Sequence, residues 1–104
     1  MNIRVTGKNL DISDALQDRV IERVEASLGK YFDGSAAATV SLEREGSEFR
    51  AEYSLSLSTG LVMKSSGSAQ DAYAGCDLAA DRLEKQLRRY NRKLKNHRTQ
   101  HGRP

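Results

Sequence analysis

The sequence predicts an α+β fold, a two-layer sandwich in the order β-α-β-β-β-α with a four-stranded, mostly antiparallel sheet and both helices on one face. Three observations predict it. The chain has 104 residues, the size of one domain. Its apolar residues alternate in four short segments and recur at helical spacing in two longer ones. Glycines fall mostly between these segments, and the one proline is the last residue, so neither interrupts them.

The first strand and the first helix are predicted from the opening 29 residues of the chain. Residues 2–6 alternate, with Ile3 and Val5 on one face of a short strand. Ser13 is the predicted N-cap of the helix. Leucine and valine then recur every four residues until Gly29, where we expect the helix to end.

Three further strands are predicted between turns at Gly46 and Gly60. Residues 38–42 alternate, residues 49–57 give the most regular alternation, and residues 61–67 form a weaker strand. Strands joined by short turns pair antiparallel, whereas the first strand, joined through a helix, is expected to pair in parallel with the second. One sheet face is therefore apolar, and the other, rich in serine, stays open.

A long helix is predicted at the end of the chain. Ser68 and Asp71 have the spacing of a capping box, and the helix is expected over about Ala69 to Lys95. The residues that follow offer no apolar anchor. We therefore expect one domain over residues 1–96 and a disordered basic tail, or the start of a linker, over residues 97–104.

Composition and missing motifs exclude several classes of protein. The single cysteine excludes an internal disulfide and a cysteine-based zinc site. No apolar run approaches the roughly 18 residues of a membrane span, and the N-terminus lacks the apolar segment of a signal peptide. Phosphate-binding loops and hydrolase motifs are absent, and both histidines lie in the predicted tail. We expect a cytoplasmic protein without enzymatic activity, cofactor or metal.

The charge of the chain is strongly asymmetric. The net charge is only +3. Residues 1–81 carry 8 Lys and Arg against 13 Asp and Glu, whereas residues 82–104 carry 9 against Glu84 alone, so the two parts have net charges of −5 and +8. Such a local excess attracts polyanions whatever the total charge. From charge alone, a solvated basic tail is an equally good explanation.

The last helix separates its apolar and basic residues. At about 100° per residue, one sector gathers the apolar side chains, and a sector of roughly 100° nearly opposite gathers basic ones. The apolar residues are Cys76, Ala80, Leu83, Leu87, Tyr90 and Leu94, and the basic residues are Arg82, Lys85, Arg89, Arg92 and Lys93. A solvated helix face ordinarily mixes glutamate with lysine, which this one does not, so the pattern favours polyanion binding. Charge alone does not separate RNA from DNA or from an acidic protein.

Other basic residues lie outside this helix. Arg4 and Lys8 flank the first strand, and Lys30 follows the first helix. They either extend the basic surface or pair with nearby acids, and the sequence does not separate the two.

Several motifs resemble the bacterial ribosome hibernation promoting factors and the related ribosome-associated inhibitor, protein Y. The resemblance covers about Asn2 to His97. Its markers are Ile3-Arg4-Val5-Thr6-Gly7-Lys8-Asn9, Asp11-Ile12-Ser13-Asp14-Ala15-Leu16, Lys30-Tyr31-Phe32-Asp33, Asp71-Ala72-Tyr73-Ala74-Gly75-Cys76-Asp77 and Asp81-Arg82-Leu83-Glu84-Lys85-Gln86-Leu87. Ala72 and Cys76 depart from the family's usual larger residues, and the acidic C-terminal tail of the protein Y branch is absent.

The resemblance implies a fold related to double-stranded-RNA-binding domains and a protein that binds the small ribosomal subunit. It implies docking at the mRNA and A- and P-site tRNA channel, inhibition of translation and protection of idle ribosomes in stationary phase or starvation. The family's basic positions that face rRNA match Arg82, Lys85, Arg89 and Lys93. Further partners implied are a ribosome modulation factor or a C-terminal dimerisation domain; neither membrane nor DNA is expected. The alternatives are a generic structured-RNA-binding module and an interaction domain for an acidic protein.

Overall fold

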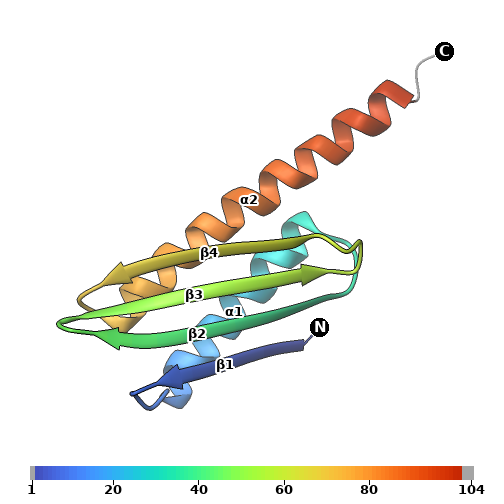
Figure 1. Cartoon of the computed structure of the whole chain (residues 1–104). Coiled ribbons are helices and arrows are strands. Elements are labelled where there is room, and N and C mark those ends of the chain that lie inside the picture. The colour runs from blue at the N-terminus through green and yellow to red at the C-terminus, as the bar shows by residue number, and fades with distance from the viewer. Residues whose placement is uncertain (1, 102–104) are drawn as a thin grey trace.

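The structure is a computed structural model that describes the backbone of residues 2–101 and the side chains of residues 2–93. Its element order is the predicted one (Figure 1). The elements are β1 (Asn2–Lys8), α1 (Asp14–Tyr31), β2 (Ala36–Glu45), β3 (Glu48–Leu57), β4 (Val62–Ala69) and α2 (Ala72–His101).

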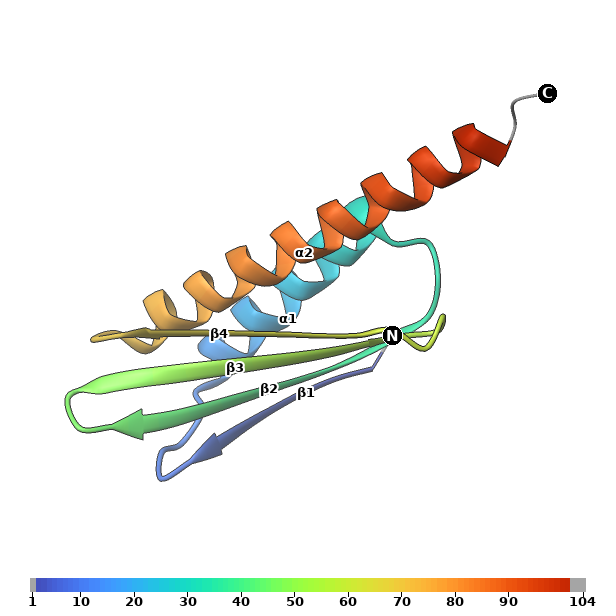
Figure 2. The same cartoon turned by 45° about the horizontal axis from the view of Figure 1, so that its top comes forward.

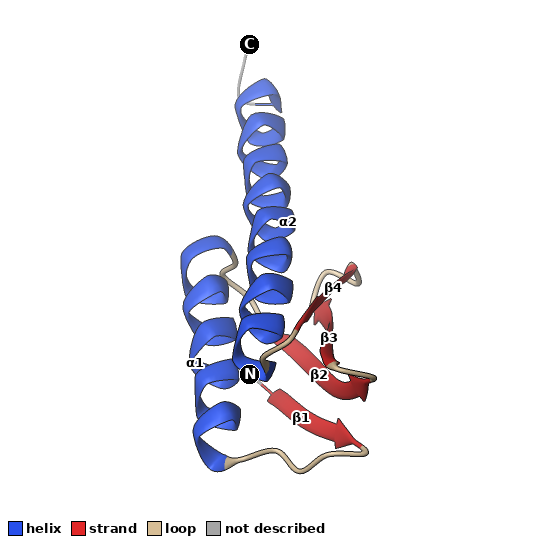
Figure 3. Ribbon diagram, turned by 90° about the vertical axis from the view of Figure 1, so that its left-hand side faces the viewer, coloured by secondary structure: helices blue, strands red, loops and turns tan. Residues whose placement is uncertain are grey.

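The four strands form one sheet in the order β1-β2-β3-β4. β1 pairs in parallel with β2, and the other two pairs are antiparallel, which confirms the predicted mixed sheet. Both helices lie on the same side of the sheet (Figure 2, Figure 3). The relation to double-stranded-RNA-binding domains that the resemblance implies stays a prediction.

The core lies between the sheet and the helices and follows the predicted alternation. Val40 and Leu42 of β2 and Leu55 of β3 are fully buried, and Leu28 of α1 and Leu87 of α2 pack against them from the helical layer. The intervening strand residues face the opposite side, as the period of two requires. Neither α1 nor the described part of α2 contains an apolar stretch of the length that a membrane crossing needs.

The predicted ends of both helices need correction. α1 continues through Gly29 to Tyr31 and is closed by the backbone N–H of Phe32, which donates to the Leu28 carbonyl. A single glycine lowers helix stability without ending the helix. Ser68 is not the cap of α2 because it is still paired with β3; Asp71 caps the helix, its Oδ2 accepting from the Ala74 N–H at 3.1 Å.

α2 also extends further than predicted. Its backbone is helical to His101, so the first residues of the expected tail continue the helix. Between Gly75 and Gly102 the sequence holds neither proline nor glycine, so no helix-breaking residue interrupts this stretch. Residues 102–104 lie outside the described part of the chain. The second half of α2 projects beyond the sheet (Figure 1).

Candidate nucleic-acid interface

Close packing fixes how α2 lies against the sheet. A Cβ at Gly67 of β4 would lie 2.8 Å from the Ala79 nitrogen, and one at Gly75 would lie 3.0 Å from the Phe49 carbonyl oxygen. These two glycines therefore let the helix and the strands approach more closely than any side chain permits. Leu83 and Leu87 are buried on the same face of α2. This packing leaves the opposite face of the helix in solvent.

The acidic side chains of α2 face α1, where each has a partner. Asp77 forms a bidentate pair with Arg19, with the shorter contact at 2.7 Å, and this hydrogen bond raises the pKa of Arg19. Asp81 accepts a single hydrogen bond from Arg23 Nη2, and this bond raises the pKa of Arg23. Glu84, the last acid of the helix, accepts a hydrogen bond from Ser27 at 2.7 Å.

Glu84 also lies 4.0 Å from Arg23. All three acids of α2 therefore have partners on α1, although the Asp81 side chain is 60% exposed. The negative charge of these acids is neutralised at the contact between α1 and α2, so it does not balance the basic residues of α2.

The exposed second half of α2 carries a surface that we call the cationic ridge. Its members are Lys85, Arg88, Arg89, Arg92 and Lys93. All five side chains are exposed, and none makes an ion pair within the described residues. Four of them enclose a shallow hollow of about 130 Å³ that no other residue lines: Lys85, Arg88, Arg89 and Arg92. Closely spaced, unpaired cations of this kind suit phosphate groups.

Arg88 is a member of the ridge that the sequence analysis missed. It follows Lys85 by three residues and precedes Arg92 by four, the spacing of neighbours on one helix face. Including it widens the basic sector from roughly 100° to roughly 140°. The same helical wheel would have found it with a broader sector.

Arg82 has a different environment from the ridge. Its Nη1 donates to the Ser66 carbonyl oxygen of β4 at 2.7 Å. Four residues on, Gln86 Nε2 donates to the Lys64 carbonyl oxygen, also at 2.7 Å. β4 is an edge strand, so these two side chains cover carbonyls that would otherwise accept another strand. Arg82 is thus partly committed to the fold, although the sequence assigns it to RNA binding.

The two predicted basic residues outside α2 lie on different elements, Lys30 on α1 and Lys8 on β1. Lys30 is exposed in the last turn of α1, and this end of α1 is tied to α2, where Asn91 donates to the Tyr31 carbonyl at 2.9 Å. Lys8 ends β1, at the edge of the sheet far from the second half of α2 (Figure 1). Its Nζ lies 3.9 Å from Glu43 Oε1. The end of α1 that carries Lys30 therefore lies near α2, whereas Lys8 lies far from the ridge.

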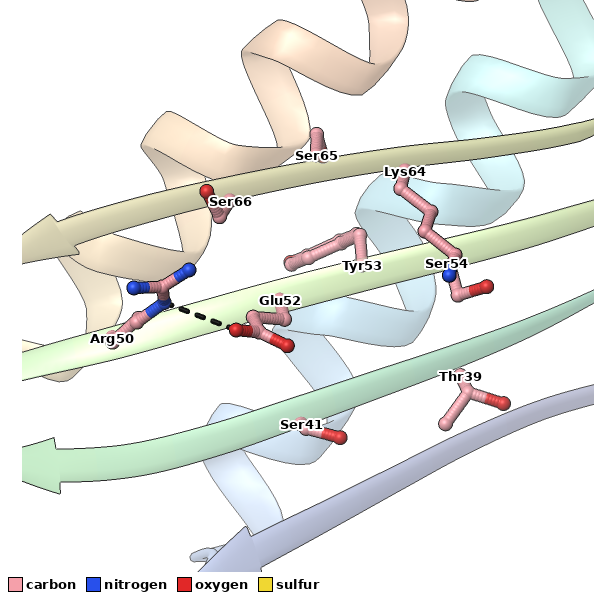
Figure 4. A pocket seen from close by; sticks show the side chains of 9 residues that line it. All are labelled: Thr39, Ser41, Arg50, Glu52, Tyr53, Ser54, Lys64, Ser65 and Ser66. Atoms are coloured by element: carbon pink, nitrogen blue, oxygen red, sulfur yellow. Dashed lines mark ion pairs between the residues drawn. The ribbon is translucent and has the colours of Figure 1, made fainter.

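The open face of the sheet holds a larger hollow of about 410 Å³ (Figure 4). Hydroxyl side chains make up much of its lining, among them Thr39, Ser41 and Ser54. Arg50 Nε lies 3.1 Å from Glu52 Oε1 within it. Lys64 is the other charged residue of the lining, so the hollow carries a net charge of +1, far less than the ridge, and is the weaker candidate for a polyanion.

Catalytic and metal chemistry finds no support in the described residues. Cys76 is buried, and burial raises the pKa of its thiol to about 11, so it remains protonated at neutral pH. Residues 2–93 hold no group of three histidine, cysteine or acidic side chains placed to bind a metal. The side chains of His97 and His101 lie outside the described set.

Comparisons with known proteins find relatives over most of the chain. The chain is 42% identical over 102 residues to the ribosome hibernation promotion factor of Rhizobium meliloti (strain 1021), covering 98% of this chain and 54% of that protein. It is 33% identical over 97 residues to the ribosome hibernation promoting factor of Escherichia coli (strain K12), covering 93% of this chain and 100% of that protein. The chain spans about half the length of the first curated relatives that it matches.

A solved structure matches as well. The N-terminal domain of Thermus thermophilus Protein Y superposes with a TM-score of 0.79 at 37% identity, covering 86% of this chain and 99% of that domain. Residues 3–95 match the family model described as Sigma 54 modulation protein / S30EA ribosomal protein. The family is not enzymatic, in agreement with the sequence prediction. The chain belongs to the Sigma 54 modulation protein / S30EA ribosomal protein family.

Proposed function

We propose that this chain is a ribosome hibernation factor that binds the small ribosomal subunit and silences translation. It occupies the mRNA channel at the A and P sites, blocks tRNA and stabilises idle ribosomes in stationary phase or starvation. The observation that carries the proposal is the cationic ridge, an exposed and unpaired basic surface on a rigid helix. Relatives named as hibernation factors support the biological role.

The physical mechanism is steric occupation held by electrostatic contacts. Ridge side chains neutralise rRNA phosphates and release condensed counterions, which supplies affinity without reading sequence. Arg82 precedes the ridge on the same helix, Lys30 lies at the end of α1 near α2, and both add contacts to the RNA. Lys8 contacts a separate part of the RNA, because β1 ends far from the second half of α2.

The partners of the proposed function are the small subunit and its rRNA in the cytoplasm. A ribosome modulation factor, or a C-terminal dimerisation domain, would pair two silenced ribosomes. The Rhizobium relative supports the second possibility, since nearly half of its length lies outside the match.

Co-sedimentation with purified small subunits tests the proposal. We expect the chain to pellet with the subunit, to be displaced by tRNA and to bind an RNA duplex weakly. An Arg88→Glu/Arg89→Glu variant should stay in the supernatant, whereas Arg4→Glu, a charge reversal on exposed β1, should pellet normally.

Two results would contradict the proposal. Equal binding to free duplex would identify a generic structured-RNA-binding module. Failure to bind either RNA, together with binding to an acidic protein, would identify a protein-interaction domain.

A further inference from the structure

A second hollow lies beside the ridge, between the start of β4 and α2. It has a volume of about 270 Å³ and is lined by Leu61, Val62, Met63, Gln86, Arg89, Tyr90 and Lys93. Leu61 and Val62 are 39% and 51% exposed, and they are the large apolar side chains that the described chain leaves in solvent. Apolar surface displayed at one spot is typical of a binding site.

The rim of the hollow is polar, and hydrogen bonds hold two of its side chains in place. The Tyr90 hydroxyl lies 3.3 Å from Thr59 Oγ1, and Gln86 is tied to the Lys64 carbonyl. These contacts fix the tyrosine ring and the side of the hollow before any ligand arrives. Pockets for drug-sized ligands measure roughly 300–1,000 Å³, so this slightly smaller one suits a single ring system.

Charge at the rim selects the ligand. Arg89 and Lys93 line the hollow, and no acidic residue does. Arg89 also lines the hollow of the cationic ridge, so the two sites share one guanidinium. A ligand that fits both hollows therefore has one flat, apolar group joined to a row of anionic groups. A nucleotide within an RNA strand has this form.

We propose that this hollow accepts one unpaired nucleobase of the bound RNA, with the phosphates next to that base on Arg89 and Lys93. The inference rests on the proposed function and deepens it by naming what the protein prefers within structured RNA. The base packs on Leu61, Val62 and the Tyr90 ring, contacts that every base can make, so the preference is for an unpaired nucleotide and not for a sequence. A perfect duplex leaves the hollow empty.

Fluorescence anisotropy with two model RNAs tests the inference. One is a perfect hairpin duplex, and the other is the same hairpin with one bulged nucleotide. We expect wild-type protein to bind the bulged RNA about 3- to 10-fold more tightly, the order expected from burying two half-exposed apolar side chains. Leu61→Ser/Val62→Ser should abolish this preference and keep the salt dependence, because no phosphate contact is lost.

Controls separate this preference from folding and from charge. Ala37→Ser makes an apolar-to-hydroxyl change at an exposed position on β2, outside the hollow, and should keep the preference. Circular dichroism should show all variants folded, since both replaced side chains are exposed. Arg89→Ala should lower the affinity for both RNAs and flatten the salt dependence.

The inference is overturned if wild-type protein binds the two RNAs equally, if it binds neither, or if the double variant keeps the preference. It is also overturned if a peptide of alternating glutamate and leucine binds the hollow in a Val62-dependent way while the bulge has no effect. Failure of the proposed function is seen separately, as loss of wild-type co-sedimentation with small subunits. A protein that pellets with the subunit but ignores the bulge leaves the proposed function standing.

Discussion

In the first half of α2, up to Glu84, every acidic side chain faces α1 and has a partner there. In the second half, from Lys85 to Lys93, the basic side chains face solvent and make no ion pair among the described residues. Among the side chains that the structure describes, Leu87 is the last fully buried one along α2, and it lies where the two regions meet. One helix thus serves first as a packed element of the fold and then as a rigid support for unpaired charge.

The difference shows why the net charge of +3 understates the basic surface. Charges matter to a partner only where they are unpaired and accessible. Arg19 and Arg23 are paired with the acids of α2, so the positive charge of α1 is used within the protein. Among the side chains of residues 2–93 the ridge has no such partner, so its charge remains accessible.

The largest expected effect comes from removing a core side chain on the buried face of α2. Leu87→Ala removes a fully buried side chain from the core and should lower the free energy of unfolding by about 2–5 kcal/mol. Urea unfolding measures it. RNA affinity of the fraction that remains folded should change little, and a large loss of affinity without loss of stability would contradict the division of roles.

A smaller effect is expected where the two roles meet, at Arg82. Arg82→Ala removes the hydrogen bond to the Ser66 carbonyl and should cost about 1 kcal/mol of stability, along with some RNA affinity. Arg89→Ala is the matched control, an exposed arginine of the same helix, and should reduce affinity alone. Equal stability of the two variants in urea would show that the edge of β4 gains nothing from Arg82.

A still smaller effect is expected from breaking the helix–helix pairing. Arg23→Ala leaves Asp81 without its partner and should lower stability by only about 0.2–1 kcal/mol, because the Asp81 carboxylate is largely exposed and regains water. The freed carboxylate adds negative charge near the ridge and should weaken RNA binding slightly. Asp81→Asn in the same background should restore the binding, and anisotropy titrations measure both changes.

The last prediction concerns the free energy of unfolding at alkaline pH. Burial raises the pKa of Cys76 from 9.0 to about 11 and also raises that of Tyr53. Below pH 9 the thiol is neutral in both states; as pH rises toward 11 it ionises only when unfolded, so the free energy of unfolding falls. Cys76→Ala should show a shallower decline in urea unfolding over this range, and an identical decline would exclude the thiol as a cause.

Much of the fold was predictable from alternation and spacing. The buried positions of β2 and β3 follow a period of two, and the parallel pairing of β1 follows from its helical connection. The helical wheel placed Arg89 and Lys93 on the exposed face of α2, and the structure confirms that exposure.

Contacts between distant segments were not predictable in this way. The hydrogen bond of Arg82 to β4 and the pairing of Asp77 and Asp81 with α1 depend on how the elements pack. Ser68 fits a capping pattern locally, yet strand pairing with β3 takes precedence. Leu61 and Val62 read as ordinary strand residues, and only the packed structure leaves them exposed beside Arg89.

The salt dependence of binding to small ribosomal subunits tests the central claim most directly. If the five side chains of the ridge neutralise about five phosphates, the logarithm of affinity should fall with the logarithm of salt concentration at a slope of roughly −3.5 to −4.5. Arg89→Ala/Lys93→Ala should flatten that slope by about one to two units while the protein stays folded. An unchanged slope in the double variant would contradict the account, because the phosphates would then lie on another surface.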